Sequence, residues 1–139
     1  MKYLNLQEIE TIAYRLAQTK MTGAEPIPAF DTRFPNVLER CLAAPRQNFA
    51  EQFLYPTLLA KAAILFYLLI KNHPFQNGNK RIAMASLLVF LFRNRKWIKV
   101  DQRKLYEFAM WVAQSPASFK DETLKLIVRF LADHLIDLK

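Results

Sequence analysis

Two long apolar stretches joined by a short polar loop constrain the fold more than any other feature of this sequence. They run from Pro56 to Asn72 and from Asn79 to Phe92, and each is apolar on nearly every side. A helix without a polar face lies either at the centre of a core or in a membrane. The uncharged run from Ala62 to Ile70 is far shorter than the roughly 20 residues that a bilayer requires. We therefore predict a pair of buried core helices.

Other segments carry apolar residues at the spacing of a helix with one buried face. They are Leu6 to Gln18, Pro35 to Ala43, Asp101 to Ala113 and Phe119 to Leu138. Asn5 is the expected N-cap of the first. The prolines and the glycine between Lys20 and Pro35 predict a loop. Within it, the sequence also allows a short hairpin or flap around Ile27 to Phe34. Since no segment alternates convincingly as a strand does, the predicted class is all-α, a helical bundle around the buried pair.

The composition is typical of one domain that spans residues 1–139. With 139 residues, of which 53% are hydrophobic, the chain can bury a core without covalent cross-links. Its single cysteine, Cys41, excludes an intrachain disulfide and favours a reducing compartment. The first residues contain no apolar segment as long as that of a signal peptide. We expect a cytoplasmic protein without a membrane partner.

The net charge of +8 comes from one segment of the chain. Between Lys71 and Lys104 there are nine basic residues and one acid, Asp101, whereas the rest of the chain has eleven of each sign. Such a concentration favours anionic partners: nucleotide phosphates, nucleic acid or an acidic protein surface. For the outer cluster, which is Arg93, Arg95, Lys96 and Lys99, the alternative is an ordinary solvated face.

The loop between the two buried helices combines a base, a flexible turn and two cations. We expect Asn79 to be the N-cap of the second helix, so that the amides of its first turn point outward and form an anion site. Lys80 and Arg81 add two positive charges, and a guanidinium can hold phosphate oxygens with two parallel hydrogen bonds. His73 has a ring that titrates near neutral pH and could accept a proton from an attacking hydroxyl. Gly78 allows a ligand to approach the backbone closely.

These residues also carry a family resemblance. The segment His73-Pro74-Phe75-Gln76-Asn77-Gly78-Asn79-Lys80-Arg81-Ile82-Ala83 resembles the signature of the Fic/Doc family, and the lysine after the Gly-Asn pair resembles its Doc (death-on-curing) toxin branch. Shorter similar stretches precede it, among them Phe30-Asp31, Ala44-Pro45-Arg46 and Tyr55-Pro56-Thr57-Leu58. The resemblance extends from about Ala29 to Trp97, which is about half of the chain.

The resemblance implies a helical Fic fold that transfers part of a nucleoside triphosphate to a protein hydroxyl. In the Doc branch the terminal phosphoryl group of ATP goes to a Ser, Thr or Tyr hydroxyl of a protein target, elongation factor Tu by resemblance, and translation is arrested. Nucleotidyl-transferring members have a second glycine where this chain has Lys80, and a long cation there should obstruct the usual placing of the diphosphate. The implied roles are His73 as base, Gly78 and Asn79 as the amide cradle, and Lys80 and Arg81 as phosphate ligands. Lys71 is a further candidate cation, with an exposed lysine at a helix end as the alternative.

Two positions depart from the family pattern. Asn77 stands where the family usually has Asp or Glu. Because Mg²⁺ prefers carboxylate and phosphate oxygens, its binding through Asn77 is expected to be weak or to depend on the nucleotide. Met84 replaces the second arginine of nucleotidyl-transferring members, which fits the Doc branch better. Adenylylation (AMPylation) of a protein hydroxyl is the alternative reaction.

Restraint of the activity is expected to come from a separate antitoxin. Fic/Doc toxins are restrained by a helix that carries Ser/Thr-x-x-x-Glu followed by Gly or Asn. The stretch from Ser118 to Thr123 has the first part and lacks the Gly or Asn. We interpret Ser118 and Asp121 as caps of the last helix instead.

Two other functions stay open. Arg129 and His134 have the spacing found in metal-independent ribonucleases of the HEPN kind, although a surface helix can carry both residues without function. An inactive Fic-fold module could instead use the basic segment to dock on RNA or on an acidic protein. We favour the transferase, for which nucleic acid is not an expected partner.

Overall fold

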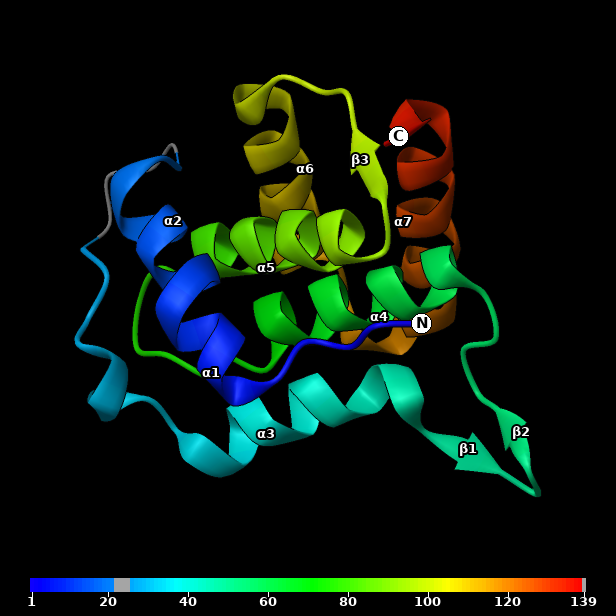
Figure 1. The fold of residues 1–139 in the computed structure, drawn as a ribbon, viewed down its shortest axis with the longest axis horizontal. Helices are drawn as coiled ribbons and strands as arrows, with labels where there is room; N and C mark the ends of the chain where they lie inside the picture. The colour runs from blue at the N-terminus through cyan, green and yellow to red at the C-terminus, as the bar shows by residue number, and fades with distance from the viewer. Residues whose placement is uncertain (22–25, 139) are drawn as a thin grey trace.

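The predicted pair of buried helices forms the centre of the molecule. The computed structural model describes residues 1–21 and 26–138. In it α4 (Leu58–Lys71) and α5 (Asn79–Arg93) lie side by side (Figure 1). The side chain of Thr57 caps α4 by accepting a hydrogen bond from the amide of Ala60 at 3.0 Å. Most residues of both helices are buried, which explains why neither segment has a polar face. Within the described ranges, no helix is long and apolar enough to cross a membrane.

The N-terminal helical segment packs against α5. It consists of α1 (Leu6–Glu8), the π-helical turn η1 (Ile9–Ala13) and α2 (Tyr14–Thr19). Asn5 caps the segment as predicted, because its side chain accepts from the amide of Glu8 at 2.8 Å while the Glu8 carboxylate accepts from the amide of Asn5 at 3.2 Å. The same carboxylate pairs with Arg93 at the end of α5.

The long loop before α3 does not contain the hairpin that the sequence allowed there. Residues 26–34 contain the 3-10 turn η2 (Phe30–Thr32) and form no strand. Pro26 and Pro28 lack the amide hydrogen that a strand ladder needs, which disfavours a hairpin there. The structure instead has a hairpin of β1 (Asn48–Phe49) and β2 (Gln52–Phe53). It follows α3 (Pro35–Ala43), which has the predicted bounds, and the turn η3 (Ala44–Arg46).

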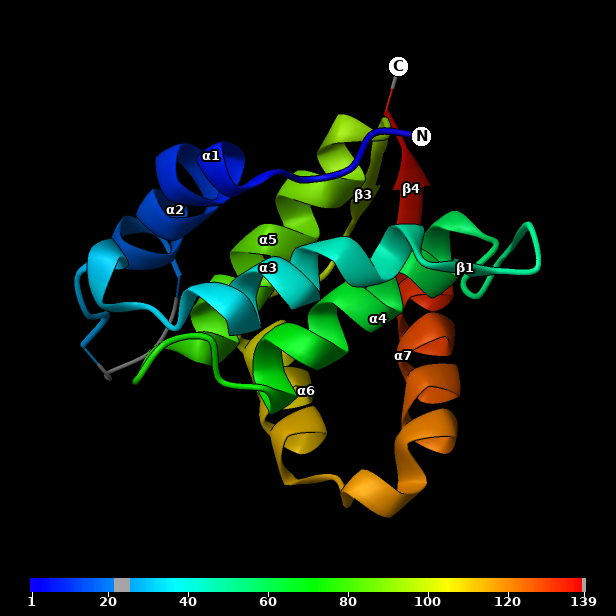
Figure 2. The same ribbon diagram turned by 90° about the horizontal axis from the view of Figure 1, so that it is seen from below.

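The C-terminal part covers the other side of the central pair. The turn η4 (Ala117–Phe119) joins α6 (Gln102–Gln114) to α7 (Lys120–His134), and Figure 2 shows both helices on the side opposite α1 and α2. Asp101 caps α6, as its predicted start implies, by accepting from the amide of Arg103 at 2.8 Å. The predicted caps of α7 are wrong: Ser118 lies inside η4, and the N-cap residue, Phe119, makes no side-chain capping bond.

The last helix is also shorter than predicted. It ends at His134 rather than Leu138, because residues Leu135–Asp137 form β4 and pair antiparallel with β3 (Lys96–Ile98). This pairing joins segments far apart in the sequence, and such tertiary contacts override local periodicity. Since both sheets in the described residues have only two short strands, the all-α class is confirmed.

Candidate active site

The loop that joins α4 to α5 is anchored in the core by Phe75. This side chain is fully buried, and its ring lies 6.0 Å from that of Tyr14 and 5.8 Å from that of Phe30. The loop 26–34 closes over it, because the amide of Phe34 donates to the carbonyl of Pro74 at 2.8 Å. Two segments, the N-terminal helical segment and the loop 26–34, therefore hold the loop at one end of the buried pair, and a rigid mount of this kind suits catalysis.

Gly78, rather than Asn79, is the N-cap of α5. Its φ of +77° lies in the left-handed region, and the first helical hydrogen bond runs from the amide of Ile82 to the Gly78 carbonyl at 3.0 Å. The predicted capping role of Asn79 is therefore wrong, because the chain turns into the helix one residue earlier. The helix still presents its first-turn amides and the positive end of its dipole at the loop. Ile27 packs on Gly78 so closely that a Cβ there would lie 2.7 Å from the Ile27 Cγ1.

Asn79 instead ties the loop together through its side chain. Its Oδ1 accepts from the amide of Phe75 at 3.0 Å, and its Nδ2 donates to the Phe75 carbonyl at 2.8 Å. Because an amide nitrogen can only donate, these two bonds fix which end of the Asn79 side chain is the oxygen. Its Nδ2 also lies 3.4 Å from Nδ1 of His73. Asn79 thus links the loop, the start of α5 and the candidate base.

His73 is exposed and has an unusual backbone conformation. Its φ of +49° lies in the left-handed region, which is uncommon for a residue with a side chain. Strained backbone of this kind persists only when the surroundings hold it, and it often occurs at functional sites. The Asn79 contacts and the buried Phe75 ring supply that support here.

The three candidate cations have different surroundings. Arg81 is only 6% exposed, and its Nη2 is buried without a hydrogen-bond partner among the described residues. A buried donor without an acceptor is costly, so this nitrogen is a natural ligand for a phosphate oxygen. Lys80 is half-buried beside the loop. The ammonium of Lys71 donates to the carbonyls of Ala113 and Ser115 at the end of α6, which gives it a structural role.

The loop and the start of α5 together line a pocket of about 190 Å³. Its lining includes His73, Asn77, Gly78, Asn79 and Lys80, together with Ile70, Gln76 and Ala113. The sequence therefore identified five of the lining residues, whereas Arg81 and Lys71, which it also predicted, do not line this pocket. It missed Ala113, which comes from α6 and is far away along the chain. Small-molecule sites usually enclose about 300 to 1,000 Å³. This pocket is smaller than that range, so it has room for only part of a ligand of nucleotide size.

The site does not form a metal centre from protein groups alone. Asn77 and Gln76 are exposed and offer neutral amide oxygens. Among the described residues there is no group of three or more His, Cys, Asp or Glu side chains that could hold a metal ion. Since Mg²⁺ requires carboxylate or phosphate oxygens for firm binding, the protein residues do not fit the ion without a nucleotide.

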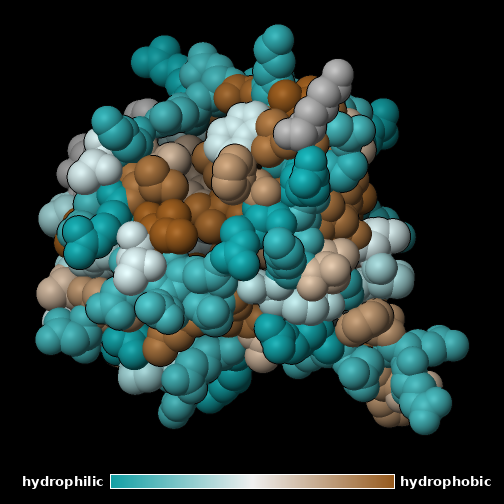
Figure 3. Space-filling view, viewed as in Figure 1, coloured by the Kyte–Doolittle hydropathy of each residue, from teal (hydrophilic) through white to brown (hydrophobic). Residues whose placement is uncertain are grey.

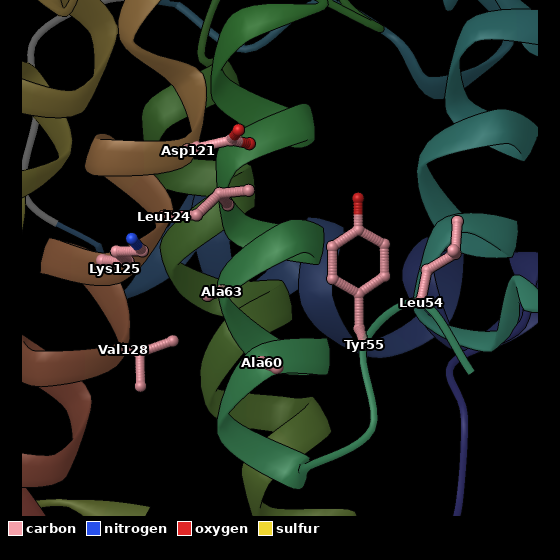
Figure 4. Close-up of a pocket in the computed structure, with 8 residues that line it drawn as sticks. All are labelled: Leu54, Tyr55, Ala60, Ala63, Asp121, Leu124, Lys125 and Val128. Carbon is pink, nitrogen blue, oxygen red and sulfur yellow. The ribbon is translucent and has the colours of Figure 1, made fainter. Parts of the chain in front are cut away.

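A larger hollow of about 480 Å³ lies elsewhere, over the N-terminal half of α4. Figure 4 shows small residues of α4 between Leu54 and Tyr55 on one side and side chains of α7 on the other. Burial, and to a lesser extent the charge of Asp121, raises the pKa of Tyr55. This hollow shares no lining residue with the His73 pocket, so its greater size does not make it the candidate active site.

The alternative ribonuclease pair does not converge. His134 contacts its own helix, with Nδ1 2.8 Å from the carbonyl of Phe130 and its ring 4.5 Å from the Phe130 ring. Arg129 lines a surface hollow to which His134 does not contribute. Both residues therefore fit an ordinary surface helix.

Comparison with known proteins assigns the chain to a family. The sequence model of the Fic/DOC family matches residues 3–91. The chain belongs to the Fic/DOC family. It is 35% identical over 65 residues to the Toxin Doc of Mycolicibacterium smegmatis, and the matched region is 47% of this chain and 50% of that protein. The chain thus spans about half the length of this curated relative, and no solved structure matches. The resemblance to the Fic/Doc family and its Doc branch is confirmed, as is the helical Fic fold.

Proposed function

We propose that this Fic/DOC protein transfers the terminal phosphoryl group of ATP to a Ser, Thr or Tyr hydroxyl of a protein. The observation that carries the proposal is the shared pocket, which is lined both by His73 and by the first residues of α5, with Nδ1 of His73 3.4 Å from Nδ2 of Asn79. His73 would accept the proton of the attacking hydroxyl as its oxygen bonds to the γ-phosphorus. The bond from that phosphorus to the bridging oxygen would break, and ADP would leave.

The phosphate groups would be held by the start of α5. The amides after Gly78 and the helix dipole favour negative charge there. Lys80 adds a cation at the pocket, and the Nη2 of Arg81 adds a buried donor that has no acceptor among residues 1–21 and 26–138. Phosphoryl transfer depends mainly on such positioning and charge stabilisation. We leave Lys71 out of this site because carbonyls of α6 already bind its ammonium.

Two features favour phosphoryl over nucleotidyl transfer. Lys80 occupies the position at which nucleotidyl-transferring relatives are expected to have a glycine, and the pocket of about 190 Å³ suits the phosphate end of the nucleotide. Any Mg²⁺ would have to arrive with the nucleotide, since Asn77 and Gln76 offer only amide oxygens.

The Doc branch suggests the biological setting. We infer a toxin that acts on elongation factor Tu in the cytoplasm, arrests translation and is restrained by a separate antitoxin. The matched Toxin Doc supports this setting by its name.

The test uses ATP labelled on the γ-phosphate or on the α-phosphate, with purified elongation factor Tu and with a bacterial lysate. We expect protein-bound label from the γ-phosphate only, and its loss in His73→Ala. The matched control is His134→Ala, which removes the only other histidine of the chain and should keep the activity. Label from the α-phosphate would replace the proposal with adenylylation. Absence of His73-dependent label from either position would refute a transferase.

A further inference from the structure

A second surface lies where α2, α5 and β3 meet, apart from the His73 pocket. A groove of about 470 Å³ is lined there mainly by apolar side chains, among them Ile12, Leu16, Met21, Leu88, Phe92 and Trp97. Figure 3 shows hydrophobic side chains gathered between α2 and α5 and surrounded by hydrophilic ones. The groove shares no lining residue with the pocket at His73.

The outer end of this groove exposes large aromatic and aliphatic groups. Leu88 is 9% exposed, but Phe92, one turn further along α5, is 61% exposed, and Ile12 on the facing segment is 41% exposed. The rings of Phe92 and Trp97 stand nearly perpendicular, with centroids 6.5 Å apart. A contiguous apolar depression rimmed by polar residues marks an interaction site more often than a solvated surface. Aromatic residues at such a site commonly contribute most to binding.

The border of the groove is strongly basic. Between Arg93 and Lys104 there are six basic residues and one acid. Arg95 and Lys99 are exposed on either side of Trp97 in the sequence, and Arg103 is exposed next to Gln102, which lines the groove. Arg93 also lines it, but its charge is paired with Glu8. A partner that complements both features must carry apolar side chains and negative charge.

We propose that this groove docks a short acidic segment of another protein. Large apolar side chains of that segment would fill the groove, and its carboxylates would face Arg95, Lys99 and Arg103. Nucleic acid fits less well, because the walls are largely aliphatic and the perpendicular Phe92 and Trp97 rings do not form a platform for parallel stacking of bases. The inference does not depend on the transferase activity.

The experiment selects binders from a random library of short displayed peptides against the full chain. Selected peptides are then synthesised, and their affinities are measured for the unaltered protein and for variants. Phe92→Glu places a charge in the groove, whereas the double variant Arg95→Glu with Lys99→Glu reverses the border without touching the apolar lining. The matched control is Phe49→Glu, which changes a 76% exposed phenylalanine on β1. Circular dichroism confirms that each variant is folded.

We expect the selected peptides to be net negative and to carry at least two large apolar residues. Either groove variant should weaken their binding by about tenfold or more, because charge in an apolar site and loss of charge complementarity both remove central contacts. Phe49→Glu should leave it unchanged, and binding should weaken with added salt. The inference is overturned if the selected peptides are neutral or basic, if their binding survives both groove variants, or if none is selected. Single-stranded RNA that binds through the same residues more tightly than the peptides would equally overturn it.

Discussion

Gly78 gives the sharpest test of how the candidate active site is built. At its φ of +77°, replacement by alanine should cost about 1 to 2 kcal/mol in backbone strain. The new Cβ would also lie 2.7 Å from the Cγ1 of Ile27, and crowding of this kind costs about 1 to 3 kcal/mol. We therefore expect Gly78→Ala to lower the free energy of unfolding by about 2 to 5 kcal/mol.

A double-mutant cycle separates these two contributions. Ile27→Ala removes the side chain that the new Cβ would meet and leaves the backbone of Gly78 unchanged. In that background Gly78→Ala should cost only its backbone part, about 1 to 2 kcal/mol. The two substitutions should therefore be coupled by about 1 to 3 kcal/mol.

The assay is urea unfolding of the four proteins, followed by tryptophan fluorescence. Ile27→Ala alone provides the control, because it measures the cost of losing this half-buried side chain while residue 78 stays glycine. Strictly additive effects would refute the reasoning, since they would mean that the loop 26–34 does not press on the start of α5.

Four further results are expected. Asn79→Ala should lower the free energy of unfolding by about 2 to 4 kcal/mol, because the buried amide and carbonyl of Phe75 lose their hydrogen-bond partners. Urea titration measures this loss, and an unchanged free energy of unfolding would show that the two bonds are unimportant. Lys71→Met should destabilise the fold by about 1 to 2 kcal/mol and leave the KM for ATP unchanged, whereas a raised KM would indicate a phosphate ligand. Burial raises the pKa of Cys41 from 9.0 to about 11. The unfolded thiol therefore ionises first as the pH rises. The associated stability is present below pH 9, and about 2 kcal/mol of it is lost by pH 11. Unfolding of Cys41→Ala across that pH range should lack this component, and an equal slope in both proteins would contradict it. Asn77→Asp should raise the rate of label transfer at limiting Mg²⁺, and a rate without any change in metal dependence would place this side chain away from the ion.

The sequence predicted those parts of the fold that depend on local pattern. The buried helices α4 and α5, the cap at Asn5 and the bounds of α3 follow from periodicity and capping residues that lie within one segment. The end of α7 could not be predicted in this way, because residues after His134 pair with β3, and only the folded chain brings them together. The hairpin of β1 and β2 is too short to show alternation.

The candidate site was predictable in membership more than in roles. His73, Gly78 and Lys80 are recognisable because their residue types suit the proposed chemistry. Asn79 was assigned a cap because asparagine favours that position, but the left-handed Gly78 takes the position and frees the Asn79 side chain to bind Phe75. The role of Lys71 depends on where α6 ends, which no local pattern reveals.

The same loop shows why stability and function oppose each other here. His73 and Gly78 have positive φ, and Arg81 has a buried nitrogen without a hydrogen-bond partner in the part of the chain that the structure describes. Each of these features lowers the stability of the free protein. These features persist because neighbouring side chains stabilise the loop, above all the buried ring of Phe75 and the hydrogen-bonded amide group of Asn79. A bound phosphate would satisfy the Arg81 donor without moving that support, so the groups that make the free site unfavourable are the ones a nucleotide would use.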